Sequence, residues 1–245
     1  MKQLLLYPIG CTASCRYASA NLQEAGISLI DHPSPDVTHL LLDIPSREIA
    51  QAKEVLRMLP NDITVIGGDL EIDSLSSYNR IDLLQDPYYL AKNATITAEC
   101  ALRVATSHLS TTLADSPTLI LGWGRIGKCL ANMLSSIGCD VTVAARKEAD
   151  RAMLVALGYH AVDFPQISET LQCCRLLFNT VPALPLHSSI IDTWKQGIAI
   201  DLASAPGMQG ESIISARGLP GKYAPESSGR LIANTILRFL KEETK

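Results

Sequence analysis

The chain is poor in aromatic residues and has no excess of basic ones, and both shortages narrow its possible functions. Aromatic residues make up 5% of 245 positions, and 21 lysines and arginines face 25 aspartates and glutamates, giving a formal net charge of -4. No run of basic residues interleaved with aromatic side chains is present to follow a phosphate backbone. We therefore expect no nucleic acid partner.

Long hydrophobic runs are also missing. Pro8 interrupts the apolar residues at the start of the chain, whereas an export signal needs an apolar segment of ~7 to 15 residues. Nor does any other segment approach the ~18 consecutive apolar residues of a membrane-spanning helix. The sequence therefore predicts a cytoplasmic protein without membrane contact.

The seven cysteines follow no disulfide or metal-binding pattern. An odd number of cysteines in a cytoplasmic chain is typical of reduced thiols. The pair Cys11 and Cys15 and the neighbours Cys173 and Cys174 both lack CxxC spacing. We expect no metal site.

In the first third of the chain, short apolar runs alternate with amphipathic stretches. Runs of this length, bounded by Gly, Pro or Asp, are typical of strands buried on both faces of a parallel sheet. Gly67 and Gly68 end one such strand, in the position where open α/β sheets place ligands. The predicted strands are residues 4–7, 27–30, 38–42 and 63–66, and the predicted helices are residues 13–25 and 46–59.

A helical pattern follows over residues 86–113. Ala98, Leu102 and Ala105 recur at helical spacing on one face, which predicts a single long helix. Thr97 is the expected N-cap, and Glu99 then lies in the first turn, where a carboxylate favours the helix dipole.

A second βα series begins at residue 118 and has the same apolar character. Its predicted strands are residues 118–121, 141–144, 176–178 and 198–202, and its predicted helices are residues 125–137 and 148–157. The last helix, residues 227–240, is expected to return to the first lobe. The fold class is thus α/β with two lobes: a smaller flavodoxin-like or Rossmann-like N-terminal lobe (residues 1–96 plus about 223–245) and a C-terminal Rossmann lobe (residues 115–222), joined by a long helix over residues 97–114.

A glycine-rich turn lies between the first strand and the first helix of the second series. Gly122 permits the tight turn, Gly124 lets a pyrophosphate approach the backbone, and Gly127 lets helix and strand pack closely. The same spacing also occurs in plain strand-to-helix turns that bind nothing. The strand before, the helix after and the returning strand favour a dinucleotide site. The expected cofactor contacts are Gly122, Trp123, Gly124, Arg125, Ile126 and Gly127.

The end of the next strand favours NADP over NAD. NAD-binding proteins usually place Asp or Glu about 20 residues after the first glycine, on the ribose hydroxyls. Here Ala145, Arg146 and Lys147 stand in that region, and a guanidinium can pair with a 2′-phosphate. The alternative is that both cations belong to a solvated helix start.

Four segments resemble the dipicolinate synthase A-chain family, with similarity from about residue 63 to the C-terminus. They are residues 93–99, the glycine turn with residues 138 and 145–146, residues 179–182 with 201–204, and residues 218–234. The first sixty residues match poorly, and Cys100 stands where the family pattern has glycine.

This resemblance implies an NADP-dependent oxidation that converts a cyclic dihydro- or hydroxytetrahydro-dicarboxylate to pyridine-2,6-dicarboxylate. The family acts with a second, flavoprotein-like subunit, and we also expect a homo-oligomer. Glu99 is the candidate base, and Thr97, Lys222 and Arg230 are candidate substrate contacts. Further cofactor contacts expected at strand ends are Asn179, Thr180, Val181, Pro182, Ala203 and Ser204.

Two other functions fit the same sequence. One is a stand-alone dehydrogenase of 2-hydroxy or amino acids, although the Arg, Glu and His set of those enzymes is not found at its usual spacing. The other is a dinucleotide-binding assembly subunit without turnover.

Overall fold

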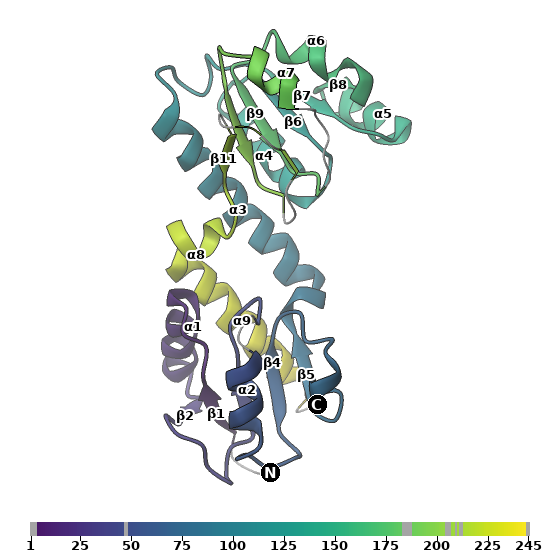
Figure 1. The fold of residues 1–245 in the computed structure, drawn as a ribbon. Helices are drawn as coiled ribbons and strands as arrows, with labels where there is room; N and C mark the ends of the chain where they lie inside the picture. Colours follow the sequence, from purple (N-terminus) through teal and green to yellow (C-terminus); the bar gives the residue numbers. More distant parts are fainter. Residues whose placement is uncertain are drawn as a thin grey trace. The chain divides into compact units, whose positions relative to one another are not determined.

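The computed structural model describes residues 4–46, 49–182, 188–203, 207–208, 210 and 213–243. The chain divides into two compact units (Figure 1). Unit 1 comprises Met1–Asn93 and Pro220–Lys245, and unit 2 comprises Ala94–Leu219. The predicted α/β class and the return of the C-terminal helix to the first unit are confirmed.

Unit 1 is built on a parallel sheet with strand order β2-β1-β3-β4-β5. This is the flavodoxin-like order. The strands are β1 (Leu5–Pro8), β2 (Ser28–Leu29), β3 (His39–Leu41), β4 (Thr64–Gly67) and β5 (Asn79–Asp82). The helices are α1 (Ala13–Glu24), α2 (Ile49–Leu56), α8 (Leu219–Tyr223, at the sequence boundary of the units) and α9 (Pro225–Glu243), with short 3-10 turns η1 (Asp73–Leu75) and η2 (Leu83–Gln85).

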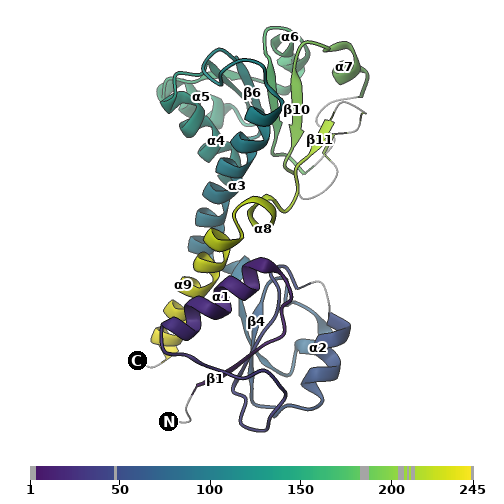
Figure 2. The same cartoon turned by 90° about the vertical axis from the view of Figure 1, so that its left-hand side faces the viewer.

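Both faces of this sheet are covered by helices, with α1 and α9 side by side on one face and α2 on the other (Figure 2). Successive side chains of a strand point to opposite faces, so Leu41 joins the core under α1 and α9 whereas Leu40 joins the core under α2. On the first side, Ile232 and Ile236 of α9 contribute to the core. The C-terminal helix is therefore an integral part of unit 1.

The long helix α3 (Pro87–His108) begins ten residues earlier than its predicted N-cap, and Thr97 as N-cap was wrong. Pro87 occupies the first turn, and the carboxylate of Asp86 accepts a hydrogen bond from the backbone N–H of Tyr89 at 2.6 Å. The same carboxylate pairs with Arg238 of α9 at 2.6 Å. Thr97 and Glu99 consequently lie in the middle of the helix, away from its dipole end.

Unit 2 contains a parallel sheet of order β11-β10-β9-β6-β7-β8. This is the Rossmann order, with two strand sets wound outward from the neighbours β6 and β9. The strands are β6 (Thr118–Leu121), β7 (Val141–Ala144), β8 (His160–Val162), β9 (Leu176–Asn179), β10 (Ile198–Asp201) and β11 (Ile213–Ser215). The helices are α4 (Arg125–Ser136), α5 (Glu148–Ala156), α6 (Ile167–Leu171) and α7 (Ser188–Thr193), with the turn η3 (Phe164–Gln166).

No helix in the described part of the chain is long and apolar enough to cross a membrane. The seven cysteines are all free thiols, and they differ in exposure. Cys11 and Cys173 are exposed, whereas Cys15 and Cys174 are buried. Burial is the main reason that the pKa of Cys15 and that of Cys174 are each raised to about 12.

This difference predicts the order of thiol labelling in the folded chain. Because the thiolate is the reactive form, Cys15 and Cys174 stay protonated and unreactive at mildly alkaline pH, and Cys11 and Cys173 react first with iodoacetamide. Peptide mass spectrometry over a labelling time course measures the order. In Cys173→Ser the fast fraction should lose one thiol, and equal rates at all four positions would contradict the burial described here.

Candidate functional site

The strand register of unit 2 brings several predicted site residues to one edge of the sheet. Leu121 is in register with both Ala144 and Asn179, and Asn179 is in register with Asp201. The strands are parallel, so the loops that follow all four strands leave from the same edge. Strands β6 and β9 are the topological switch point of this sheet, where open α/β folds bind ligands.

The glycine turn after β6 has the geometry that its sequence predicts. Gly122 has φ +97°, a conformation that other residues rarely adopt. A Cβ atom added at Gly127 would lie 2.2 Å from the carbonyl oxygen of Gly122, so only glycine lets α4 approach the turn this closely. A Cβ atom at Gly124 would meet nothing within 4 Å. Two of the glycines are thus required by packing, and the third leaves the backbone open to a ligand.

The N-terminus of α4 opens at Gly124. This residue is the N-cap and has no side chain to accept hydrogen bonds from the first-turn N–H groups. Uncapped N–H groups and the positive end of the helix dipole together suit a phosphate. Trp123 is half-buried and packs edge-on against Tyr159, with ring centroids 5.9 Å apart, while the Nζ atom of Lys128 lies 5.6 Å from its ring. Arg125 is exposed and Ile126 is half-buried.

The loop after β9 is hydrogen-bonded to the end of β6, next to this turn. Thr180 donates a hydrogen bond from its Oγ1 atom to the carbonyl of Leu121 at 2.8 Å. A Cβ atom on Gly122 would lie 2.8 Å from that Oγ1 atom and 2.9 Å from Val181 Cγ2, so the two loops touch. Pro182 is exposed at the end of the loop.

Asn179 is fully buried, and its amide is used within the protein. Its Nδ2 atom donates to the carboxylate of Asp201 at 2.8 Å and to the carbonyl of Val181 at 3.1 Å, and its Oδ1 atom accepts from the N–H of Val181 at 3.0 Å. The Asp201 carboxylate also accepts from the N–H groups of Ala203 and Gly207, each at 3.2 Å. These two side chains shape the loops after β9 and β10, of which Ser204 lies outside the described residues.

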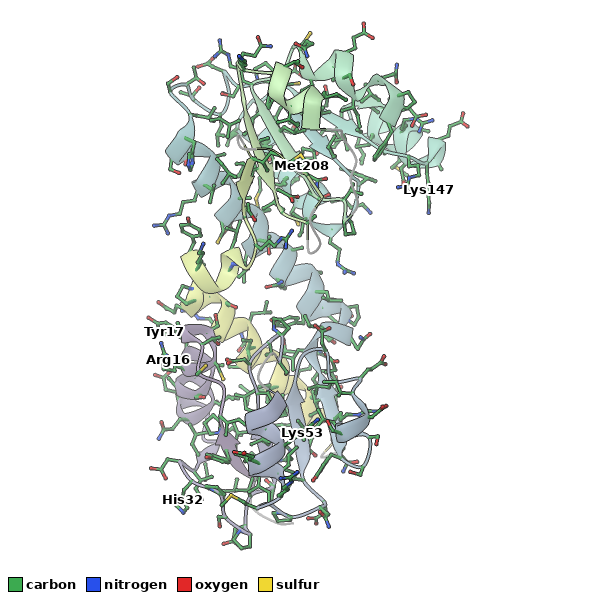
Figure 3. All side chains as sticks on the ribbon, viewed as in Figure 1. Arg16, Tyr17, His32, Lys53, Lys147 and Met208 are labelled. Carbon is green, nitrogen blue, oxygen red and sulfur yellow. The ribbon has the colours of Figure 1, made fainter. Side chains whose placement is uncertain are left out.

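The loop after β7 presents two cations. Arg146 and Lys147 are exposed, and the guanidinium of Arg146 lies 5.7 Å from the centre of the Phe164 ring. Lys147 is the N-cap of α5, and its side chain projects away from the ribbon at the right-hand edge of the view (Figure 3). Ala145 is buried and donates its N–H to the carbonyl of Val162 at 3.1 Å, which joins this loop to β8.

The remaining candidates occupy other elements. Glu99 is exposed on α3 and Thr97 is buried there, both in unit 2. Earlier on the same helix, the Oγ1 atom of Thr95 lies 3.7 Å from Cys129 Sγ on α4. Lys222 and Arg230 belong to unit 1, and Arg230 forms an exposed ion pair with Glu226 at 2.8 Å.

The corresponding strand ends of unit 1 differ from those of unit 2 in charge. After β3, the carboxylate of Asp43 accepts hydrogen bonds from the N–H groups of Cys11 and Thr12, at 3.0 and 3.1 Å, and from the hydroxyl of Thr12 at 2.6 Å. A carboxylate of the protein therefore already compensates the N-terminus of α1. The glycine turn of unit 2 has no such carboxylate at its N-cap, so it suits an anion better.

Comparisons with known proteins agree with this geometry. Residues 91–195 match the family described as D-isomer specific 2-hydroxyacid dehydrogenase, NAD binding domain. The A subunit of dipicolinate synthase from Bacillus subtilis is 29% identical over 159 residues, which cover 61% of this chain and 54% of that protein. The predicted resemblance is confirmed. The chain thus matches only about half the length of this curated relative.

Two solved structures share the whole fold. The A subunit of dipicolinate synthase from Bacillus halodurans superimposes with a TM-score of 0.86 at 21% identity, covering 98% of each chain. The dipicolinate synthase A chain from Bacillus subtilis superimposes with a TM-score of 0.81 at 20% identity, covering 99% of this chain and 97% of that one. The two structures show that the fold is shared, and the family match over residues 91–195 supports a nicotinamide dinucleotide as the cofactor of unit 2.

Sequence reasoning missed three residues around the β7 loop, namely Arg151, Asp163 and Phe164. The Nη1 atom of Arg151 donates to the carbonyls of Ala145 and Arg146, each at 2.8 Å, and lies 3.3 Å from the carboxylate of Asp163. Arg151 looks like any charged residue of an amphipathic helix. The only available signal was that Asp163 and Phe164 follow a short apolar run.

The glycine turn gives a matched pair of variants. Gly124→Ala should fold like the parent, with unfolding free energy changed by about 0.5 kcal/mol or less, because open space surrounds the added methyl. The same methyl should lower dinucleotide affinity about tenfold or more, equivalent to about 1.4 kcal/mol. Gly127→Ala should cost about 1–3 kcal/mol of stability, because its methyl meets the Gly122 carbonyl.

Denaturant unfolding and calorimetric titration of both variants measure these effects. Parent-like dinucleotide binding by Gly124→Ala would show that the turn does not hold a pyrophosphate. A Gly127→Ala variant as stable as the parent would contradict the close packing of α4 on the turn.

Proposed function

We propose that this chain is an NADP-dependent oxidoreductase that acts as the A subunit of a dipicolinate synthase. The observation that carries the proposal is the loop after β7. Arg146 stands there, against Phe164, where a carboxylate would mark an NAD site. A guanidinium attracts a 2′-phosphate, and a carboxylate would repel it.

The proposed reaction removes a hydride and a proton from a cyclic dihydro-dicarboxylate to give an aromatic pyridine dicarboxylate; a hydroxytetrahydro substrate also loses one molecule of water. NADP, when bound, accepts the hydride. The protein has to bind the pyrophosphate at the turn between Gly122 and Gly127 and the 2′-phosphate at Arg146, with Lys147 adding positive charge. The loops after β9 and β10, shaped by Asn179 and Asp201, then border the nicotinamide half of the coenzyme.

The proton released in the reaction requires a base, and Glu99 is the proposed one. Its side chain is exposed, one helical turn after Thr95, whose Oγ1 atom contacts Cys129 of α4. Thr97, Lys222 and Arg230 are the proposed substrate contacts. A substrate carboxylate at Arg230 would have to compete with Glu226, which already pairs with that guanidinium.

The partner and the compartment are also part of the proposal. The curated relative from Bacillus subtilis is by its name one subunit of an enzyme. We expect a second, flavoprotein-like subunit, copies of this chain that associate with one another, and a cytoplasmic location. A stand-alone dehydrogenase of 2-hydroxy acids is the second candidate, favoured by the match of residues 91–195 to that family's coenzyme domain.

Replacing Arg146 tests the coenzyme. Arg146→Asp should weaken NADP binding about a hundredfold while NAD binding changes by no more than about threefold, because only NADP carries the 2′-phosphate. Arg175→Asp, an exposed position at the amino end of β9, is the matched control and should change neither affinity. Equal weakening of both coenzymes by Arg146→Asp would overturn the NADP assignment.

A second titration tests the substrate class. Calorimetry of the purified chain with NADP should show tighter binding when pyridine-2,6-dicarboxylate is present, because product and coenzyme occupy adjoining parts of one site. Lactate and alanine serve as comparison ligands for the stand-alone dehydrogenase. Enhancement by lactate or alanine, but not by the pyridine diacid, would favour that second candidate.

A further inference from the structure

The loop that carries Arg146 is held by a second arginine. Arg151, one turn into α5, is largely buried, with a side chain that is 23% exposed. Its Nη1 atom donates hydrogen bonds to two successive backbone carbonyls, those of Ala145 and Arg146, each at 2.8 Å. Two charge-assisted hydrogen bonds to adjacent carbonyls restrict the peptide that sets the direction of the Arg146 side chain.

Asp163 in turn fixes Arg151. Its carboxylate lies 3.3 Å from the same Nη1 atom. This carboxylate is itself held, because Oδ1 accepts the N–H of Phe164 at 2.7 Å, and the N–H of Asp163 donates to the Gln166 side chain at 2.9 Å in a capping box. Asp163 therefore joins two elements, the helix α5 through Arg151 and the turn η3 through Phe164.

Arg151 and Phe164, the two residues that Asp163 links, both contact Arg146. Arg151 holds its backbone, and Phe164, whose position depends on Asp163, lies under its guanidinium at 5.7 Å. The backbone and the side chain of Arg146 are thus constrained separately by residues that themselves form an ion pair.

We infer that Arg151 and Asp163 are positioning residues for recognition of the coenzyme 2′-phosphate: together they hold Arg146 in its binding conformation before the coenzyme arrives. This inference rests on the proposed NADP dependence. Arginine loses much rotamer freedom when it is immobilised, and a guanidinium fixed in advance avoids part of that cost on binding. Selectivity for NADP over NAD then depends on residues that do not touch the phosphate.

The opposing explanation is that Arg151 contributes through its charge, as a second cation for the phosphate. The two explanations predict opposite effects of Asp163→Asn. The Asn side chain can keep the cap on Phe164 through its own Oδ1 atom but loses the charge that holds Arg151. If Arg151 and Asp163 position Arg146, NADP binding weakens; if Arg151 acts as a free charge, removing the nearby carboxylate strengthens it.

Three variants of the full chain test the inference, with NADP and NAD as the titrated ligands. Arg151→Lys keeps the charge but replaces the guanidinium, whose Nη1 atom donates to both carbonyls, with an ammonium that lies one bond closer to the backbone. It and Asp163→Asn should each weaken NADP about five- to tenfold and leave NAD within about twofold. Arg175→Lys at the opposite edge of the sheet is the control, and circular dichroism with thermal melting verifies folding of each variant.

Arg146→Ala distinguishes a failure of the positioning role from a failure of the NADP assignment. If it lowers NADP affinity while Arg151→Lys and Asp163→Asn do not, the positioning role is wrong and the NADP assignment stands. Tighter NADP binding by Asp163→Asn would likewise overturn positioning in favour of charge. If Arg146→Ala leaves NADP affinity unchanged, the coenzyme assignment itself fails, and the positioning role fails with it.

Discussion

The contact between Gly127 of α4 and the carbonyl oxygen of Gly122 is the constraint on which the candidate site depends. A Cβ atom at Gly127 would lie 2.2 Å from that oxygen, so the helix can begin this close to the strand only because the side chain is missing. The approach places the first-turn N–H groups of α4 directly above the end of β6. The same turn contacts Thr180 and Val181 of the neighbouring loop, so the spacing at Gly127 also sets how the two halves of the unit meet at the switch point.

Much of the fold could be predicted because most strands are buried on both faces. The predicted limits of β6 and β7 agree with the structure, since each strand is a short run of apolar residues and threonine that follows Pro117 or Asp140. The strands β5, β8 and β11 were missed, and all three lie at sheet edges. In β5 only Ile81 is buried, and the exposed polar residues Asn79 and Arg80 give the segment no apolar run from which a strand could be predicted. An edge strand forms through backbone hydrogen bonds to one neighbouring strand. Its side chains therefore need not show the apolar pattern from which strands are predicted.

The candidate site likewise contains residues that local sequence patterns predict and residues that they do not. The glycine turn was predictable because each glycine answers a local requirement of the backbone. The helical pattern over residues 86–113 included the start of α3, but the predicted N-cap was Thr97, although Asp86 followed by Pro87 is a local capping signal. Arg151 and Asp163 carried little local signal: Arg151 looks like any charged residue of an amphipathic helix, and Asp163 only follows a short apolar run. The hydrogen bond from Arg151 to the Arg146 carbonyl, five residues earlier, depends on the turn at the start of α5. Asp163 joins the pair only once the sheet brings the loops after β7 and β8 together.

The two halves of the strand edge in unit 2 differ in charge, and this asymmetry has a physical rationale. On the β7 side, Arg146 and Lys147 are exposed cations, whose charge agrees with the 2′-phosphate proposed to bind there. On the β10 side, the buried carboxylate of Asp201 accepts hydrogen bonds from Asn179, Ala203 and Gly207, all of them neutral donors. The exposed cations therefore lie on the side of the edge where the proposed 2′-phosphate would bind, whereas the buried carboxylate on the other side orders the loops after β9 and β10.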